Sequence, residues 1–142
     1  MEFNEIIFGT EQYDQEVKLR QQILRGPLGL DIHEEDLDSE TLQLHFGLFD
    51  EGDLKACVVI LPFEDTQAKL RQMAVAEDLQ GKGFGKILME EVEKYLTETG
   101  FKEIELHARE TAVGFYEKLG YEVCSEEFTE VNIPHFKMIK AI

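Results

Sequence analysis

The chain has 142 residues, and its 14 Lys and Arg against 30 Asp and Glu give a formal net charge of -16. A length of this order fits a single domain over residues 1–142, and a hydrophobic fraction of 43% excludes a disordered chain. A nucleic-acid-binding surface needs a basic patch, which this acidic balance disfavours. No apolar stretch approaches the roughly 20 residues of a membrane-spanning helix. We therefore expect neither nucleic acid nor membrane as a partner.

The N-terminus and the cysteines favour a cytoplasmic location. Residues 1–5 lack a basic segment before an apolar run, so we expect no secretory signal. Cys57 and Cys124 lie far apart, each in a strand-like stretch, and we expect both to be buried free thiols. No histidine stands at zinc-ligand spacing from either cysteine, so we expect no metal site.

The first half of the chain predicts a strand, a helix, an acidic loop and a hairpin. Thr10 is placed to N-cap the helix, and Gly26-Pro27 is placed to end it. The acidic loop is either a solvated segment or a negative rim that attracts cationic amines. Its acids are Asp31, Glu34, Glu35, Asp36, Asp38 and Glu40. The elements are a strand over 2–8, a helix from Tyr13, a loop over 28–39 and strands over 42–49 and 54–61.

The second half predicts strands that alternate with helices. Ile87, Leu88 and Val92 recur at helical spacing between charged residues, which indicates an amphipathic helix. The alternation implies an α/β protein with a mixed central sheet flanked by helices. The elements are strands over 70–76 and 104–108, helices over 84–97 and 111–119, and closing strands over 121–124 and 136–139.

Three glycines at alternate positions, Gly81, Gly83 and Gly85, separate the strand over 70–76 from the strongest helix. The first N–H groups of a helix have no intrahelical partner, and the helix dipole favours an anion there. Lys82 and Lys86 add positive charge in an acidic chain. Neither the Rossmann fingerprint nor the Walker loop fits, because Lys86 replaces the third glycine of the former and no Ser or Thr follows it. The pattern indicates either a phosphate site or a turn without a ligand.

Two segments resemble the GNAT superfamily of acetyl-CoA-dependent N-acetyltransferases. Gln80-x-x-Gly83-x-Gly85 resembles the Arg/Gln-x-x-Gly-x-Gly/Ala signature of that family, and residues 73–76 resemble the strand before it. Residues 106–121 resemble the family's late strand, the following helix and its Tyr-Glu-Lys-Leu-Gly-Phe ending. The two motifs stand in the family's order and separation, and they cover about the second half of the chain.

The resemblance implies a GNAT-like α/β (α+β) fold with a splay between the strand at 70–76 and the strand at 104–108. It implies acetyl-CoA as cosubstrate, with its pyrophosphate on the backbone amides of residues 81–86 and its pantetheine arm along Met73 and Val75. Arg109 stands where many relatives carry a cofactor-contacting Asn; it could serve a phosphate or pair with an acid. The implied cofactor-binding residues are Met73, Ala74, Val75, Gln80, Gly81, Lys82, Gly83, Phe84, Gly85, Lys86 and Arg109.

The resemblance also implies catalytic residues. Tyr116 matches the tyrosine that often protonates the departing CoA thiolate, although a core aromatic is the alternative. Some relatives carry a Glu base before the loop, but residues 69–73 offer no carboxylate, so water or a residue elsewhere would serve. His107, near the expected cleft, and His135, in an Ile-Pro-His element that resembles one in some relatives, are candidates for catalysis or for structure. We expect a structural role for His45.

The predicted function is transfer of an acetyl group from acetyl-CoA to the primary amine of a small molecule, by direct attack in a ternary complex. The acceptor pocket would include Arg20, Arg25 and His45. The arginines could grip a phosphate or carboxylate, or pair with Glu16 or Asp31 at the surface. The alternatives are a non-catalytic module that binds or senses CoA or acyl-CoA, and an interaction domain whose glycine loop binds nothing. Homodimers are common among the relatives.

Overall fold

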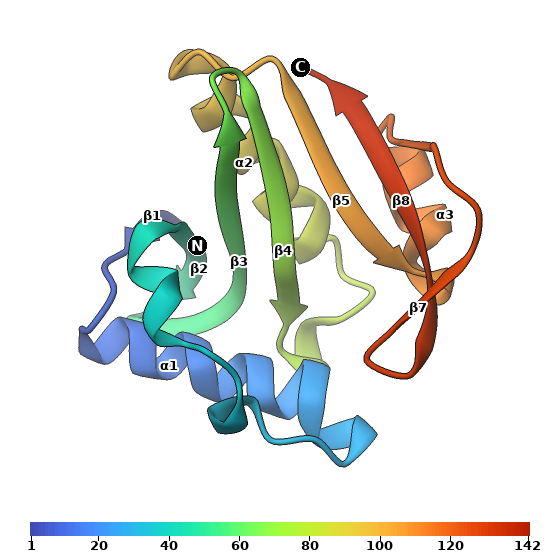
Figure 1. Ribbon diagram of the computed structural model, residues 1–142. Helices are drawn as coiled ribbons and strands as arrows, with labels where there is room; N and C mark the ends of the chain where they lie inside the picture. Colours follow the sequence, from blue (N-terminus) through green and yellow to red (C-terminus); the bar gives the residue numbers. More distant parts are fainter.

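The computed structural model describes residues 1–142, which form a mixed β-sheet with helices on both faces (Figure 1). The strand order is β1-β2-β3-β4-β5-β8-β6, with β7 paired to β8. The pair β4–β5 is parallel and the other pairs are antiparallel, which confirms the predicted mixed sheet. The strands are β1 (Glu2–Ile6), β2 (Leu44–Asp50), β3 (Asp53–Glu64), β4 (Gln67–Val75), β5 (Glu103–Arg109), β6 (Glu122–Val123), β7 (Phe128–Glu130) and β8 (Ile133–Ala141).

The helices divide the core between the two faces of the sheet. Helix α2 (Phe84–Glu98) and helix α3 (Val113–Lys118) pack on one face, where Leu88, Val92 and Tyr116 join the main core. Helix α1 (Glu11–Arg20) covers the other face with a smaller apolar cluster. A π-helical turn over Gln21–Arg25 continues α1, and short 3-10 turns cover Gly26–Leu28, Ile32–Glu34, Asp38–Leu42, Glu77–Leu79 and Glu110–Ala112.

Strands β4 and β5 separate along their length. Their parallel register holds four pairs, from Gln67–Glu103 to Leu70–Leu106. Strand β4 nevertheless runs on to Val75, and β5 runs on to Arg109. The carboxyl halves of the two strands therefore have no hydrogen-bond ladder between them, which is the splay expected from the resemblance, and Figure 1 shows them diverging toward their ends.

A β-bulge interrupts β4 where the splay begins. Strand β3 partners Arg71 and Ala74, whereas Gln72 and Met73 between them have no partner in that register. Gln72 has φ 52, a left-handed conformation that costs a non-glycine residue energy. Such a bulge bends the strand and leaves backbone groups unpaired.

The bulge also reverses which residues face α1. Ala68 and Leu70 belong to the core under α2, so Lys69 and Arg71 point to the α1 face by strand alternation. Without the bulge Ala74 would share the face of Ala68, but it packs in the cluster under α1. Lys69 and Arg71 therefore lie on the open side of the splay that α1 and its π-helical turn border.

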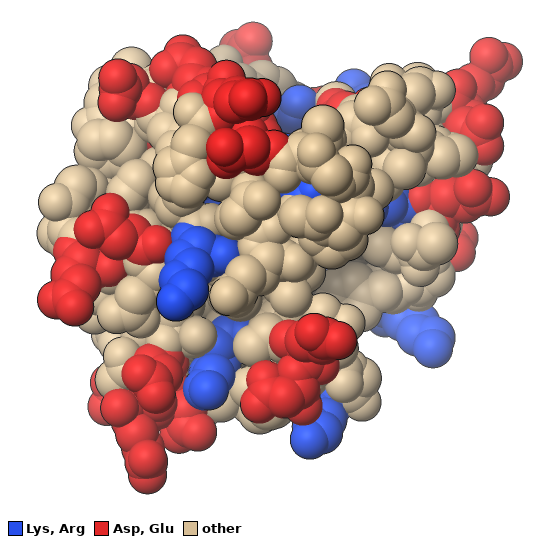
Figure 2. Space-filling view, turned by 90° about the horizontal axis from the view of Figure 1, so that it is seen from below, with Lys and Arg blue, Asp and Glu red and all other residues tan.

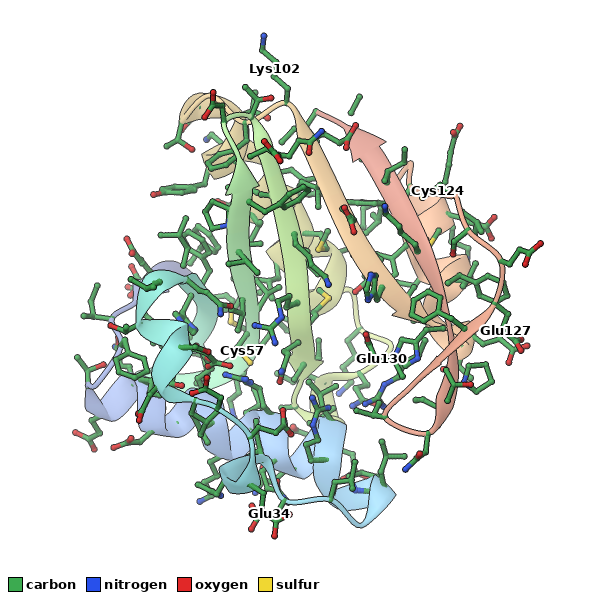
Figure 3. All side chains as sticks on the ribbon, viewed as in Figure 1. Glu34, Cys57, Lys102, Cys124, Glu127 and Glu130 are labelled. Atoms are coloured by element: carbon green, nitrogen blue, oxygen red, sulfur yellow. The ribbon has the colours of Figure 1, made fainter.

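Several predictions about the elements are confirmed and others are wrong. Thr10 caps α1 by accepting a hydrogen bond from the Tyr13 N–H at 3.4 Å. Cys57 is buried as expected, but Cys124 is exposed at the outer edge, since the predicted strand over 121–124 shrinks to a two-residue β6 (Figure 3). Strand β7 was not predicted. No helix has the length and apolar character that a bilayer crossing requires.

Candidate active site

The glycine loop leads into α2 with its backbone facing open space. Gly81 and Gly83 have φ 76 and φ 88, which side-chain-bearing residues adopt at a cost. Gly83 is the N-cap of α2 and supplies no side-chain cap, and a Cβ at Gly81 or Gly83 would meet nothing within 4 Å. Gly85 differs, because its Cβ would lie 3.2 Å from the ring of Phe115. Two glycines thus make the turn, and the third lets α3 pack against α2.

The loop residues fit an anion. The first N–H groups of α2 lack a capping side chain, and the positive end of the helix dipole faces the same space. Lys82 and Lys86 are exposed beside it, and Lys86 has a single distant ion pair, 3.9 Å from Glu90. Gln80 holds the loop in place by donating its amide to the Val75 carbonyl at 3.0 Å. The donor set therefore suits a diphosphate with two flanking lysines.

A cleft of about 310 Å³ lies where β4 and β5 separate. The π-helical turn borders one side, and the β7–β8 hairpin borders the other. The structure brings five of the predicted catalytic and cofactor-binding residues to its wall: Met73, His107, Arg109, Tyr116 and His135. Arg25, predicted for the acceptor pocket, lies there as well. The other predicted cofactor-binding residues, Ala74, Val75 and those of the glycine loop, lie outside this wall.

Tyr116 lies at the inner wall of the cleft on α3. Its side chain is 7% exposed, and its hydroxyl is 3.4 Å from the Met73 sulfur. Its ring meets Phe115 and Tyr121 edge to face. Burial raises the pKa of Tyr116 above its ordinary value, so the phenol stays protonated near neutral pH. The buried hydroxyl is therefore a fixed proton donor at the cleft.

Two histidines of the cleft converge on one carboxylate, that of Glu130. His107 Nδ1 is 3.0 Å from Glu130 Oε1, and His135 Nε2 is 3.6 Å from Glu130 Oε2. His135 Nδ1 lies 2.9 Å from the Ile133 carbonyl, to which it donates. Burial alone would raise the pKa of Glu130, but the hydrogen bond and charge of His107 outweigh it and hold that pKa low.

Sequence reasoning missed Glu130. It is an acid in an acidic stretch, and no motif distinguishes it from Glu126 or Glu127. Only the β7–β8 hairpin turns Glu130 back toward β5, whereas Glu127 lies on the outer side (Figure 3). The arrangement leaves His107 Nε2 without a hydrogen bond in the protein, because its nearest carboxylate oxygen, on Glu105, is 3.9 Å away.

Arg109 extends from the end of β5 to the π-helical turn. Its guanidinium donates to the Leu24 carbonyl at 2.9 Å. Burial, with a further contribution from the charge of Arg25, lowers the pKa of Arg109. Arg25 itself pairs with Glu35 at 2.7 Å, so the pairing suggested with Asp31 is wrong.

A buried charge network lies behind the cleft, between α1 and β2. Arg20 bonds Glu16 at 2.7 Å and both oxygens of Glu40 at 2.8 and 2.6 Å, and Tyr13 donates to Glu40 at 2.7 Å. His45 Nδ1 is 2.9 Å from Glu16, and its Nε2 is 2.9 Å from the Glu40 carbonyl. Both ring nitrogens thus face acceptors, as in a doubly protonated imidazole.

The positions of these residues contradict two predictions and agree with a third. The Arg20–Glu16 pair exists, but both side chains are fully buried rather than at the surface. Glu40 was predicted to lie in a loop that is either solvated or a negative rim, but it is 3% exposed. Burial would lower the pKa of His45, yet Glu16 outweighs it and raises that pKa, which fits the predicted structural role. The Arg20 guanidinium bonds both Glu16 and Glu40, the two carboxylates of this buried cluster.

The network also reaches the cleft through Gln72. Arg20 Nε donates to Gln72 Oε1 at 3.0 Å, which fixes the side chain of the residue in the left-handed conformation at the bulge. The buried guanidinium therefore supports the strained turn of β4 that leaves the Met73 backbone without a strand partner.

Known structures share this fold over nearly the whole chain. Escherichia coli ElaA matches at a TM-score of 0.85 and 22% identity, covering 98% of both chains. An aminoglycoside 6'-N-acetyltransferase complexed with coenzyme A matches at 0.83 and 18% identity, covering 99% of this chain and 97% of the other. A GNAT family acetyltransferase from Elizabethkingia anophelis with acetyl-CoA bound matches at 0.74 and 17% identity, covering 99% and 97%.

Sequence comparisons give the family. The uncharacterized protein YyaT of Bacillus subtilis (strain 168) is 35% identical, covering 66% of this chain and 74% of YyaT. The uncharacterized N-acetyltransferase YjcF of the same organism is 38% identical over 54% of this chain and 56% of YjcF, so the match spans little more than half of YjcF. Residues 33–142 match the acetyltransferase (GNAT) domain family. The chain therefore belongs to the GNAT acetyltransferase family.

Proposed function

We propose that this chain transfers an acetyl group from acetyl-CoA to the primary amine of a small molecule by direct attack. The observation that carries this proposal is the splay of β4 and β5, which brings Tyr116, the Met73 backbone and the His107–Glu130–His135 cluster into one cleft. One acetyltransferase domain over residues 1–142, a cytoplasmic location and a homodimer stay predictions.

The cosubstrate would lie along β4. Two solved structures of this fold hold coenzyme A or acetyl-CoA. Here the amides of residues 81–86 and the lysines beside them would hold the diphosphate, and the backbone of Met73 and Val75 would hold the pantetheine arm. Neither the β3 register nor the β5 register uses Met73. Its backbone can therefore pair with a ligand instead of a strand.

The residues of the cleft divide the proton transfers between them. When bound, acetyl-CoA would supply a thioester whose acetyl carbon accepts the amine. The Tyr116 hydroxyl would donate a proton toward the sulfur, and the Met73 N–H, at the bulge, would donate to the acetyl oxygen. His107 Nε2 would accept the proton of the amine, while Glu130 holds the ring through Nδ1. These roles supply the acid and the base that acyl transfer needs.

The test is thiol release with acetyl-CoA and a panel of amines, followed over pH for the wild type and for Glu130→Gln. We expect kcat/KM of the wild type to rise with pH, because a general base acts only in its unprotonated form. We expect the plateau of Glu130→Gln to fall about tenfold, since a neutral amide stabilises the imidazolium that forms during proton transfer less than a carboxylate does.

Glu127→Gln is the matched control, because it removes an exposed carboxylate from the same hairpin. Its profile should superpose on that of the wild type, and the amine's own titration is common to all three profiles. An unchanged Glu130→Gln profile would remove the proposed base. Acetyl-CoA binding without thiol release in the presence of any amine would favour the non-catalytic module instead.

A further inference from the structure

The arginines of this acidic chain gather at the cleft. All four arginines of the sequence lie there: Arg25, Arg71 and Arg109 line it, and Arg20 lies behind it in contact with Gln72. Lys69 lines it as well. Viewed from the side toward which β4 and β5 run, Lys and Arg side chains appear between clusters of Asp and Glu (Figure 2). A chain with 30 acidic residues thus reverses its sign at this cleft.

Three of these cations form no ion pair. No carboxylate oxygen lies within 4.0 Å of Lys69, Arg71 or Arg109, whereas Arg25 is paired with Glu35. Neutral oxygens hold the two unpaired arginines: Arg71 donates to the Gln43 side chain at 2.7 Å, and Arg109 donates to a carbonyl at 2.9 Å. These bonds fix the direction of each guanidinium and leave its charge for a ligand.

The two carboxylates of the cleft wall, Glu35 and Glu130, cancel only part of this charge. Glu35 is bound by Arg25, and Glu130 is bound by His107, while the more distant charge of Lys69 also contributes to the lowered pKa of Glu130. Glu105 stands opposite Lys69 in the strand register but lies nearest to Lys137, at 3.6 Å. Half-buried cations of like sign repel one another and lose hydration, so their gathering is unfavourable until an anion binds.

We propose that the acceptor carries an anionic group, a carboxylate or a phosphate, in addition to its amine, and that Arg71 binds this group with Lys69 and Arg109. The inference rests on the proposed function and specifies its substrate class. A guanidinium donates two parallel hydrogen bonds to a carboxylate or phosphate. The same cations disfavour an ammonium group nearby, so the bound amine loses its proton more easily and becomes a nucleophile.

Matched pairs of amines test the proposal with saturating acetyl-CoA and thiol release as the readout. β-Alanine is compared with its amide, and phosphoethanolamine with ethanolamine; spermidine represents polycationic amines. The anionic member of at least one pair should have a kcat/KM about 10- to 100-fold higher, as one or two charge-assisted hydrogen bonds provide. The two pairs distinguish a carboxylate from a phosphate.

Arg71→Gln should abolish most of that preference. It should lower kcat/KM for the member with the anionic group about 10- to 100-fold and change kcat/KM little for the member without that group. The KM for acetyl-CoA should stay unchanged. Lys69→Gln provides a second variant if Arg71→Gln folds poorly. Lys102→Gln is the charge-matched control, since Lys102 is exposed at the opposite end of the sheet (Figure 3).

The failures are distinguishable. Two results would overturn this inference and leave the proposed acetyltransferase activity intact. One is a higher kcat/KM for spermidine or for the amines without the anionic group. The other is an equal loss of kcat/KM for both members of a pair in Arg71→Gln. Absence of thiol release with every amine would instead contradict the proposed function itself.

Discussion

Replacing Arg20 by Met lowers the free energy of unfolding by about 3–5 kcal/mol, the cost of leaving a buried charge without its partner. Glu16 and Glu40 would lose the three hydrogen bonds that the guanidinium donates to them and would keep only His45 and Tyr13 as side-chain partners. Burial would lower the pKa of Arg20, but Glu40 and Glu16 outweigh it and raise that pKa, so the native guanidinium is charged at any ordinary pH. Urea unfolding followed by circular dichroism measures the loss.

Lys18→Met is the matched control for this variant. Lys18 lies on the same helix but is exposed and has no ion pair, so its replacement should change stability by about 0.5 kcal/mol or less. A loss below about 1 kcal/mol in Arg20→Met would show that the network contributes little to the fold. Arg20→Met should also lower kcat in the folded fraction, because Gln72 loses the donor that supports its left-handed conformation.

Tyr116→Phe is expected to lower kcat about 10²- to 10³-fold, the range typical of a lost general acid. The hydroxyl is the one polar atom of this side chain, and its neighbour in the cleft is the Met73 sulfur. The ring would keep its packing on Phe115 and Tyr121. The KM for acetyl-CoA should therefore stay within about threefold of the wild type, because the transition state alone loses an interaction.

Tyr95→Phe controls for removal of a hydroxyl from a tyrosine of the main core. Tyr95 packs against Phe46 from α2, and its hydroxyl forms no hydrogen bond within the protein. Its kcat should match that of the wild type. An unchanged kcat in Tyr116→Phe would show that Tyr116 is a core aromatic without a catalytic role. A loss of acetyl-CoA affinity as large as the loss of kcat would assign Tyr116 to cosubstrate binding.

Much of the predicted cofactor-binding region could be predicted from the sequence, because neighbouring residues in the chain determine its conformation. Gly81 and Gly83 mark the turn, and the spacing of Ile87 and Leu88 marks α2. The splay followed from the resemblance alone. A local signal suffices where consecutive residues make the site, as at a helix N-terminus.

The acceptor side depended on contacts between distant segments. Gln72 adopts a left-handed conformation with φ 52, which a glycine or an asparagine at this position would have indicated in the sequence. The support for this conformation comes from Arg20 on α1, a distant residue. Glu40 sits in an acidic run that resembles a solvated loop, and only folding places it on Arg20. Glu130 becomes part of the site because β7 is three residues long and turns back on β8. No periodicity in the sequence encodes these placements.

We expect the glycine loop to bind acetyl-CoA, and calorimetric titration of acetyl-CoA tests this most directly. The proteins are the wild type, Gly83→Asp and Gly100→Asp; both glycines have positive φ and open space around them, at opposite ends of α2. Asp is among the residues that tolerate this conformation best, so the comparison isolates the carboxylate at the proposed anion site. We predict micromolar binding by the wild type and by Gly100→Asp, and at least about tenfold weaker binding by Gly83→Asp. Equal affinity in Gly83→Asp, or no binding by the wild type at millimolar acetyl-CoA, would contradict the account.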